Sequence, residues 1–182
     1  VGSEMCIRDS SCSTEQLIAA GRLHEQYPGT YIQTHLSENK DEIDSTLSLC
    51  PDCQDYLEVY ERARLVTDRS IFGHCIHLSD SECRRLVEAG SVVAHCPTSN
   101  LFLGSGLFDM QQANRVGMQT VLATDIGAGT SFSMLRTMGE AYKVQQLGGY
   151  PMSVFESLYK CTLGAAKALH LDDEIGCFGK GR

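Results

Sequence analysis

Four residues that can bind a metal ion or move a proton each stand at the end of a short apolar segment: His35, His74, His95 and Asp125. One histidine in such a place is most often structural, but four segments ending this way favour a shared site over coincidence. If the segments are parallel strands, their carboxyl ends meet at one edge of the sheet. Imidazole and carboxylate suit Zn²⁺ or Fe²⁺, and a catalytic metal leaves one position open for water. The residues therefore predict a metal-dependent hydrolytic centre.

Glu38 is the residue that could move protons at this centre. It follows His35 by three positions in the stretch QTHLSEN, close enough to share a pocket and yet displaced from the metal. A carboxylate there could take a proton from water and pass it to a leaving group. The alternative is that Ser37 caps the following helix and Glu38 is an acid in its first turn. The residues alone leave both interpretations open.

The elements that would position these residues alternate between strand-like and helix-like patterns. The predicted strands are short and apolar on both faces, which is typical of a parallel sheet covered by helices. They span residues 30–35, 70–74, 91–96 and 119–125. The predicted helices span residues 13–26, 38–49, 55–65, 79–90, 108–116, 132–147 and 153–169, with capping boxes at Ser13 and Ser79. The class is α/β, and the pattern does not separate a barrel from a doubly wound sheet.

The composition narrows the classes of partner. The net charge is -8 over 182 residues, which disfavours nucleic acid or an anionic membrane surface as partner. No apolar run approaches the roughly 20 residues of a membrane helix. The nine cysteines are scattered, as expected for reduced and mostly buried thiols. Cys50 and Cys53 have zinc or redox spacing but lie between two predicted helices, so a connecting turn is the favoured interpretation.

Four stretches carry a family resemblance. QTHLSEN, FGHCIHLS, VVAHCPTSN and VLATDIGAG, in this order, resemble the amidohydrolase superfamily and, within it, the guanine deaminase family. The resemblance runs from about Cys12 to Lys180. It implies a (β/α)8 TIM barrel of which residues 12–170 form the second half, strands five to eight. Residues 171–182 would begin a truncated return to a β-sandwich, and residues 1–11, which match nothing expected, are predicted to be a junction.

The resemblance also implies an activity: hydrolysis of guanine to xanthine and ammonia by a zinc-activated water, in purine catabolism. One Zn²⁺, with Fe²⁺ as the alternative, would be bound by His35 and Asp125. Glu38 would be the proton shuttle, His74 would stabilise the tetrahedral centre, and Asp125 would hold the reacting water. His35 and Glu38 would also contact the purine, whereas His95 receives no role. The full-length parent is expected to be a cytoplasmic homodimer.

The chain also departs from this family. The two further zinc ligands would form an H-x-H pair, which this sequence lacks, and an Arg-Phe pair that contacts the purine is missing before Cys12. The chain alone is therefore expected to be inactive. Zinc deaminases with H-x-E and P-C-x-x-C do not fit, because this chain has H-x-x-E. The alternatives are another aminohydrolase or chlorohydrolase of the superfamily, or a non-catalytic interaction fragment.

Overall fold

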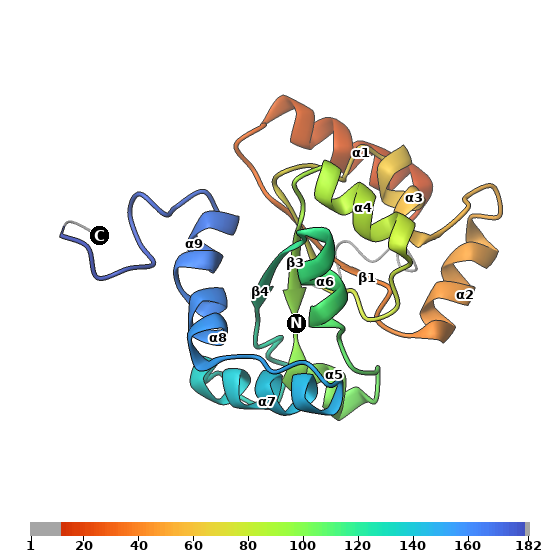
Figure 1. The fold of residues 1–182 in the computed structure, drawn as a ribbon. Coiled ribbons are helices and arrows are strands. Elements are labelled where there is room, and N and C mark those ends of the chain that lie inside the picture. Colours follow the sequence, from red (N-terminus) through yellow and green to blue (C-terminus); the bar gives the residue numbers. More distant parts are fainter. Residues whose placement is uncertain (1–11, 181–182) are drawn as a thin grey trace.

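Four parallel strands form the centre of the structure, a computed structural model that describes residues 12–180 (Figure 1). They are β1 (Ile32–Leu36), β2 (Ser70–His74), β3 (Val92–His95) and β4 (Gln119–Leu122). The predicted α/β class is confirmed. The strand predicted at 70–74 is correct at both ends, and the other three differ by a few residues at their ends. The junction predicted for residues 1–11 lies outside the described residues.

The strand order distinguishes the two architectures that the sequence left open. The strands pair in the order β1-β2-β3-β4, each parallel to the one before it. A doubly wound sheet reverses its order at a switch point, whereas a barrel adds every strand beside its predecessor. The order therefore fits one half of a barrel wall.

Helices follow and cover the strands (Figure 1). Those within residues 12–180 are α1 (Thr14–Gln26), α2 (Lys40–Leu49), α3 (Tyr56–Arg62), α4 (Asp80–Glu88), α5 (Pro97–Leu103), α6 (Met110–Val116), α7 (Met134–Leu147), α8 (Val154–Cys161) and α9 (Leu163–Ala168). Both predicted capping boxes are present, at Ser13 and Ser79. Each box satisfies backbone N–H groups that a helix start leaves without intrahelical partners.

Two predictions about the helices are wrong. No helix is predicted between the strand at 91–96 and the helix at 108–116, but α5 forms there, with Pro97 in its first turn, where proline costs no hydrogen bond. The helix predicted over 153–169 is two helices, because Thr162 leaves the helical conformation at φ -125° and ψ -103°. This break lets Gly164 pack closely on Tyr159, since an added Cβ would meet the Tyr159 carbonyl at 2.8 Å.

The two faces of the sheet differ because strand side chains alternate between them. Phe72, Val93 and Leu122 face the helices and belong to the main hydrophobic core. The opposite face carries a row of register neighbours across all four strands: His35, Gly73, Ala94 and Val121. Part of this second face packs against the alanines of α9. The remainder is open and lines the cavity described below.

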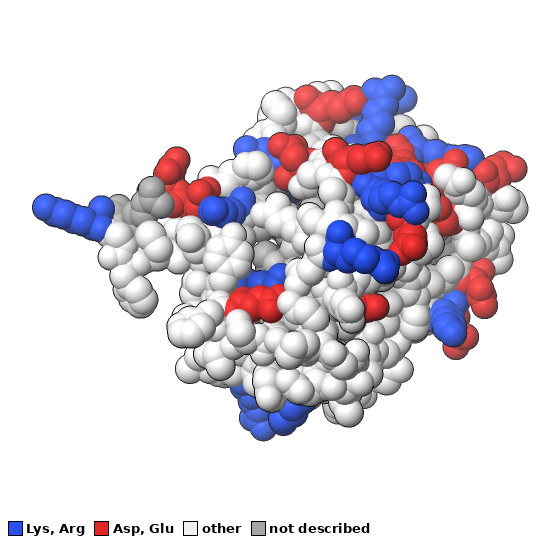
Figure 2. Space-filling model, in the orientation of Figure 1, with Lys and Arg blue, Asp and Glu red and all other residues white. Residues whose placement is uncertain are grey.

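Charged side chains of both signs are interspersed over α1 to α4 on the face seen in Figure 2. Several are paired, as where Arg85 bridges Asp55 and Glu61. The lower part of this face, over α5 to α7, carries few charges (Figure 2). Every helix within residues 12–180 is too short or too polar to cross a membrane.

Candidate active site

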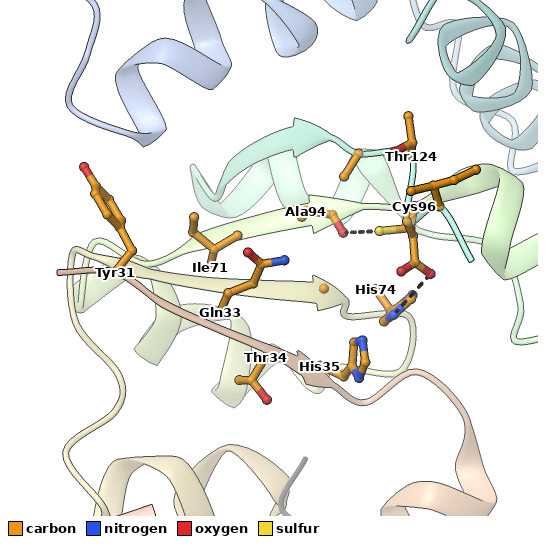
Figure 3. Close-up of a pocket in the computed structure, with 13 residues that line it drawn as sticks. Tyr31, Gln33, Thr34, His35, Ile71, His74, Ala94, Cys96 and Thr124 are labelled. Atoms are coloured by element: carbon orange, nitrogen blue, oxygen red, sulfur yellow. Dashed lines mark hydrogen bonds and ion pairs between the residues drawn. The ribbon is translucent and has the colours of Figure 1, made fainter. Parts of the chain in front are cut away.

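Three of the four strand-end residues meet at the carboxyl edge of the sheet. One ligand atom from each of His35, His74 and Asp125 lies within 4.8 Å of the other two. The two imidazole rings have centroids 4.9 Å apart, and Nε2 of His74 is 3.9 Å from Oδ2 of Asp125. Figure 3 shows the two histidines side by side at the end of the pocket away from Tyr31. Donor atoms at these separations can share one small cation.

Unusual backbone conformations turn two of these side chains into the cluster. His74 and Asp125 have φ values of 68° and 47°, in the left-handed region that non-glycine residues rarely adopt. Each such residue costs about 1–3 kcal/mol, and this strain is often found at functional sites. The loop after Asp125 folds back tightly, and a Cβ on Gly129 would lie 1.8 Å from the Thr124 carbonyl oxygen. Glycine is therefore required at position 129 to hold Asp125 in place.

Glu38 faces the cluster, although it does not belong to the helix that the sequence predicted there. Helix α2 begins at Lys40 with Asn39 as its N-cap, so the predicted start at residue 38 and the alternative cap at Ser37 are both wrong. Ser37 instead takes a left-handed conformation, with φ 49°. This turn leaves the Glu38 side chain only 3% exposed, with Oε1 3.6 Å from Nδ1 of His74.

Neighbouring residues that the sequence did not single out support the cluster. Ser105 donates a hydrogen bond from Oγ to Oε1 of Glu38 at 3.0 Å. The Tyr60 hydroxyl donates to the carbonyl of His35 at 3.0 Å, and Asn100 contacts His74. Only Asn100 gave a signal in the sequence, as the last residue of the stretch VVAHCPTSN. The others come from loops and helices whose approach to the site is decided by packing.

His95 is the strand-end residue that lies away from the cluster. It pairs in register with Leu122, on the helix-covered face, and stacks on Phe108 with ring centroids 4.8 Å apart. Neither ring nitrogen has a hydrogen-bond partner within the part of the chain that the structure describes. Burial, with a smaller contribution from the charges of His74 and Lys160, lowers the pKa of His95 from 6.5 to about 3. His95 is thus a neutral ring in the core.

Replacing His95 by phenylalanine is expected to make the complete protein less sensitive to acid. A folded-state pKa below the unfolded value means that stability is full above pH 6.5 and is lost as the pH falls towards 3. At pH 5 the free energy of unfolding is lower by about 2 kcal/mol, because each pH unit below the unfolded-state pKa costs about 1.36 kcal/mol. The melting temperature of His95→Phe relative to wild type should therefore be higher at pH 5 than at pH 7.5. An equal difference at both pH values would contradict the prediction.

The pocket beside the cluster has a volume of about 470 Å³ and follows the open face of the sheet from Tyr31 to Asp125. Gln33 and Thr124 give it polar groups, and Ile71 and Ala94 give it apolar surface (Figure 3). A mixture of this kind is typical of a small-molecule binding pocket.

The cysteines fit the structural interpretation. The cysteines at positions 50, 53, 75, 83, 96, 161 and 177 are free thiols. Cys50 and Cys53 form a turn closed by a 3.0 Å hydrogen bond from the Cys53 N–H to the Cys50 carbonyl. Burial raises the pKa of Cys53, so this thiol is not activated. Cys96 borders the pocket, but burial and the nearby charge of Asp125 raise its pKa to about 12. It stays a neutral thiol near neutral pH.

Comparisons with known proteins agree with this geometry. Residues 3–182 match the amidohydrolase family. Guanine deaminase from Escherichia coli (strain K12) is 52% identical over 170 residues, which are 93% of this chain and 39% of that protein. The solved structure of E. coli guanine deaminase has a TM-score of 0.91 at 51% identity, covering 93% of this chain and 40% of that one.

Two further solved structures are similar. Guanine deaminase from C. acetobutylicum, with guanine bound in its active site, is 32% identical with a TM-score of 0.85, covering 93% of this chain and 41% of that one. An adenosine deaminase from Xanthomonas campestris with bound zinc is 25% identical with a TM-score of 0.86, covering 94% of this chain and 39% of that one. The chain thus spans about two fifths of the length of the proteins it matches.

Proposed function

We propose, because this chain belongs to the amidohydrolase family, that the complete protein hydrolyses guanine to xanthine and ammonia and that this chain supplies part of its active site. The observation that carries the proposal is the meeting of His35, His74 and Asp125 beside Glu38. A non-catalytic fragment would have no need to bury Glu38 against His74. The identity of 52% to a guanine deaminase favours guanine over the substrates of more distant relatives.

The donor set fits one zinc ion. Imidazole and carboxylate groups suit Zn²⁺ or Fe²⁺, and a catalytic zinc takes about three protein ligands. We assign His35 and Asp125 as ligands, with the remaining ligands from elsewhere in the complete protein. When bound, the metal would lower the pKa of a water molecule from about 15.7 towards about 7.

The residues of this chain would handle the protons of the reaction. Glu38 takes a proton from the water that adds to C2 of guanine and delivers it to ring N3. The remaining proton of the added hydroxyl group then goes through Glu38 to the exocyclic amine, so that the C2–N bond breaks and ammonia leaves. His74 donates a hydrogen bond to the oxygen at C2, while His35 and Glu38 position the purine. Both protons of the water are thereby accounted for.

The function is tested by incubating the complete protein, loaded with zinc, with guanine, adenine and a chlorotriazine. We expect xanthine and ammonia from guanine, and at least 100-fold lower kcat/KM for the other two, a selectivity of about 3 kcal/mol. The purified 182-residue chain with added zinc is expected to form no xanthine. Faster turnover of adenine or the triazine would support another aminohydrolase or chlorohydrolase instead.

We also propose that the complete protein is a cytoplasmic homodimer that acts in purine breakdown. Support for an interface comes from large apolar side chains exposed on α5, in the loop before α7 and in the first turn of α7: Phe102, Phe132 and Leu135. Surfaces of this kind are often covered by another chain. Analytical ultracentrifugation gives the stoichiometry, and a monomer at micromolar concentration would contradict the proposal.

A further inference from the structure

Helix α5 and the loop after it contact both residues to which the proposed mechanism gives proton-handling roles. Nδ2 of Asn100 lies 2.9 Å from Nδ1 of His74, and Ser105 donates from Oγ to Glu38. The two contacts are linked, because the Ser105 N–H donates to the Asn100 carbonyl at 2.9 Å. All of these side chains are buried, and Asn100 is only 1% exposed. One short segment therefore contacts both His74 and Glu38.

The orientation of the Asn100 amide indicates which nitrogen of His74 carries the proton. The nitrogen of a side-chain amide can only donate, so Nδ1 of His74 must accept. A neutral imidazole that accepts at Nδ1 has its hydrogen on Nε2. Nε2 is the atom that faces Asp125, at 3.9 Å. In this form the ring presents a donor to the cluster and has no lone pair there for a cation.

Glu38 also lies beside Nδ1 of His74. Its Oε1 is 3.6 Å from Nδ1 of His74, too far for a good hydrogen bond, and accepts from Ser105 instead. A proton on Nδ1 would be drawn to this carboxylate and would occupy the oxygen that the mechanism needs. Asn100 at Nδ1 thus separates the roles of the two side chains.

We propose that Asn100 is a positioning residue that keeps His74 in the form protonated at Nε2, so that His74 acts as a hydrogen-bond donor and not as a metal ligand. His35, His74 and Asp125 together have the composition of a three-ligand site. The assignment removes His74 from the ligand set. Its catalytic consequence rests on the proposed function, whereas the position of the proton does not.

The proton position can be measured in the complete zinc-loaded protein by ¹⁵N NMR of labelled histidines, with His74 assigned through His74→Asn. We expect a protonated Nε2 and an unprotonated Nδ1 in the wild type. Asn100→Asp should move the proton to Nδ1, because a carboxylate offers only acceptors. A wild-type His74 protonated at Nδ1, or with Nε2 bound to zinc, would overturn the proposal without any variant.

Kinetics then test the positioning role. Asn100→Asp should lower kcat by about 10- to 100-fold, the usual effect of losing a supporting hydrogen bond, with KM within about threefold and unchanged zinc content. Asn100→Ala removes the contact without introducing a carboxylate charge, and it should also lower kcat. Ser99→Ala is the matched control on the same helix, since Ser99 is fully buried and its hydroxyl has no hydrogen-bond partner among the described residues.

Three outcomes are distinguishable. An Nε2 proton with reduced kcat in both Asn100 variants and normal kcat in Ser99→Ala supports the proposal. An Nε2 proton with wild-type kcat in both Asn100 variants overturns the positioning role. If the complete protein does not deaminate guanine, the proposed function fails on its own, and the NMR spectrum still decides the protonation of His74.

Discussion

Replacing Glu38 by glutamine is expected to lower kcat for guanine by about 10²- to 10⁴-fold, the usual contribution of a positioned general acid–base group. This corresponds to about 3–5 kcal/mol of the activation barrier. The glutamine side chain has nearly the same shape and keeps an oxygen that can accept from Ser105. It cannot take a proton from water, so the loss isolates proton transfer from packing.

The zinc content of the Glu38→Gln variant must be measured as well as its kinetics. In Glu38→Gln the zinc content should equal that of the wild type, because Glu38 is assigned no ligand role. Glu140→Gln, which alters a carboxylate paired with Lys143 on the surface of α7, should leave kcat unchanged. A Glu38→Gln enzyme within tenfold of wild type would contradict the shuttle assignment, and loss of zinc would identify Glu38 as a ligand.

Replacing Asp125 by asparagine is expected to remove both metal and activity. Asparagine tolerates the left-handed conformation that Asp125 adopts at φ 47°, so the backbone should be retained while the charge is lost. A bound metal supplies several kcal/mol of transition-state stabilisation, so we expect kcat/KM to fall by about 10³-fold or more. Elemental analysis should show substoichiometric zinc after dialysis.

The comparison with chelated wild type gives the control. Removing zinc from the wild type should abolish turnover, and adding zinc back should restore it. The same zinc concentration should not restore Asp125→Asn. Asp44→Asn, at an exposed position on α2, should behave as wild type. Full zinc occupancy in Asp125→Asn would show that Asp125 is not a ligand.

Much of the framework was predictable because it depends on local chemistry. The strand at 70–74 follows from its apolar residues, and α1 and α4 begin where their capping serines lie. Errors arose where tertiary contacts override local preference. Helix α5 begins at Pro97, two residues after β3 ends. Helices α8 and α9 separate at Thr162, where Gly164 packs on the Tyr159 ring.

The sequence by itself determined which chemical groups stand at the strand ends, because hydrophobic alternation and the order of elements are local properties of the chain. It could not determine which of those groups meet. His95 stands at a strand end like His35, but alternation in register with β4 turns it to the helix-covered face. His74 and Asp125 reach the cluster through left-handed backbone conformations.

Tertiary structure likewise decided the role that Glu38 can have. The residues next to Glu38 in the sequence also allowed it to be a solvated acid in the first turn of a helix. In the structure the left-handed turn at Ser37 and the approach of Ser105 bury Glu38 against His74. Ser105 lies 67 residues further along the chain, and Asn100 lies 26 residues beyond His74. Contacts over such separations depend on how helices pack against a sheet, and no local pattern encodes them.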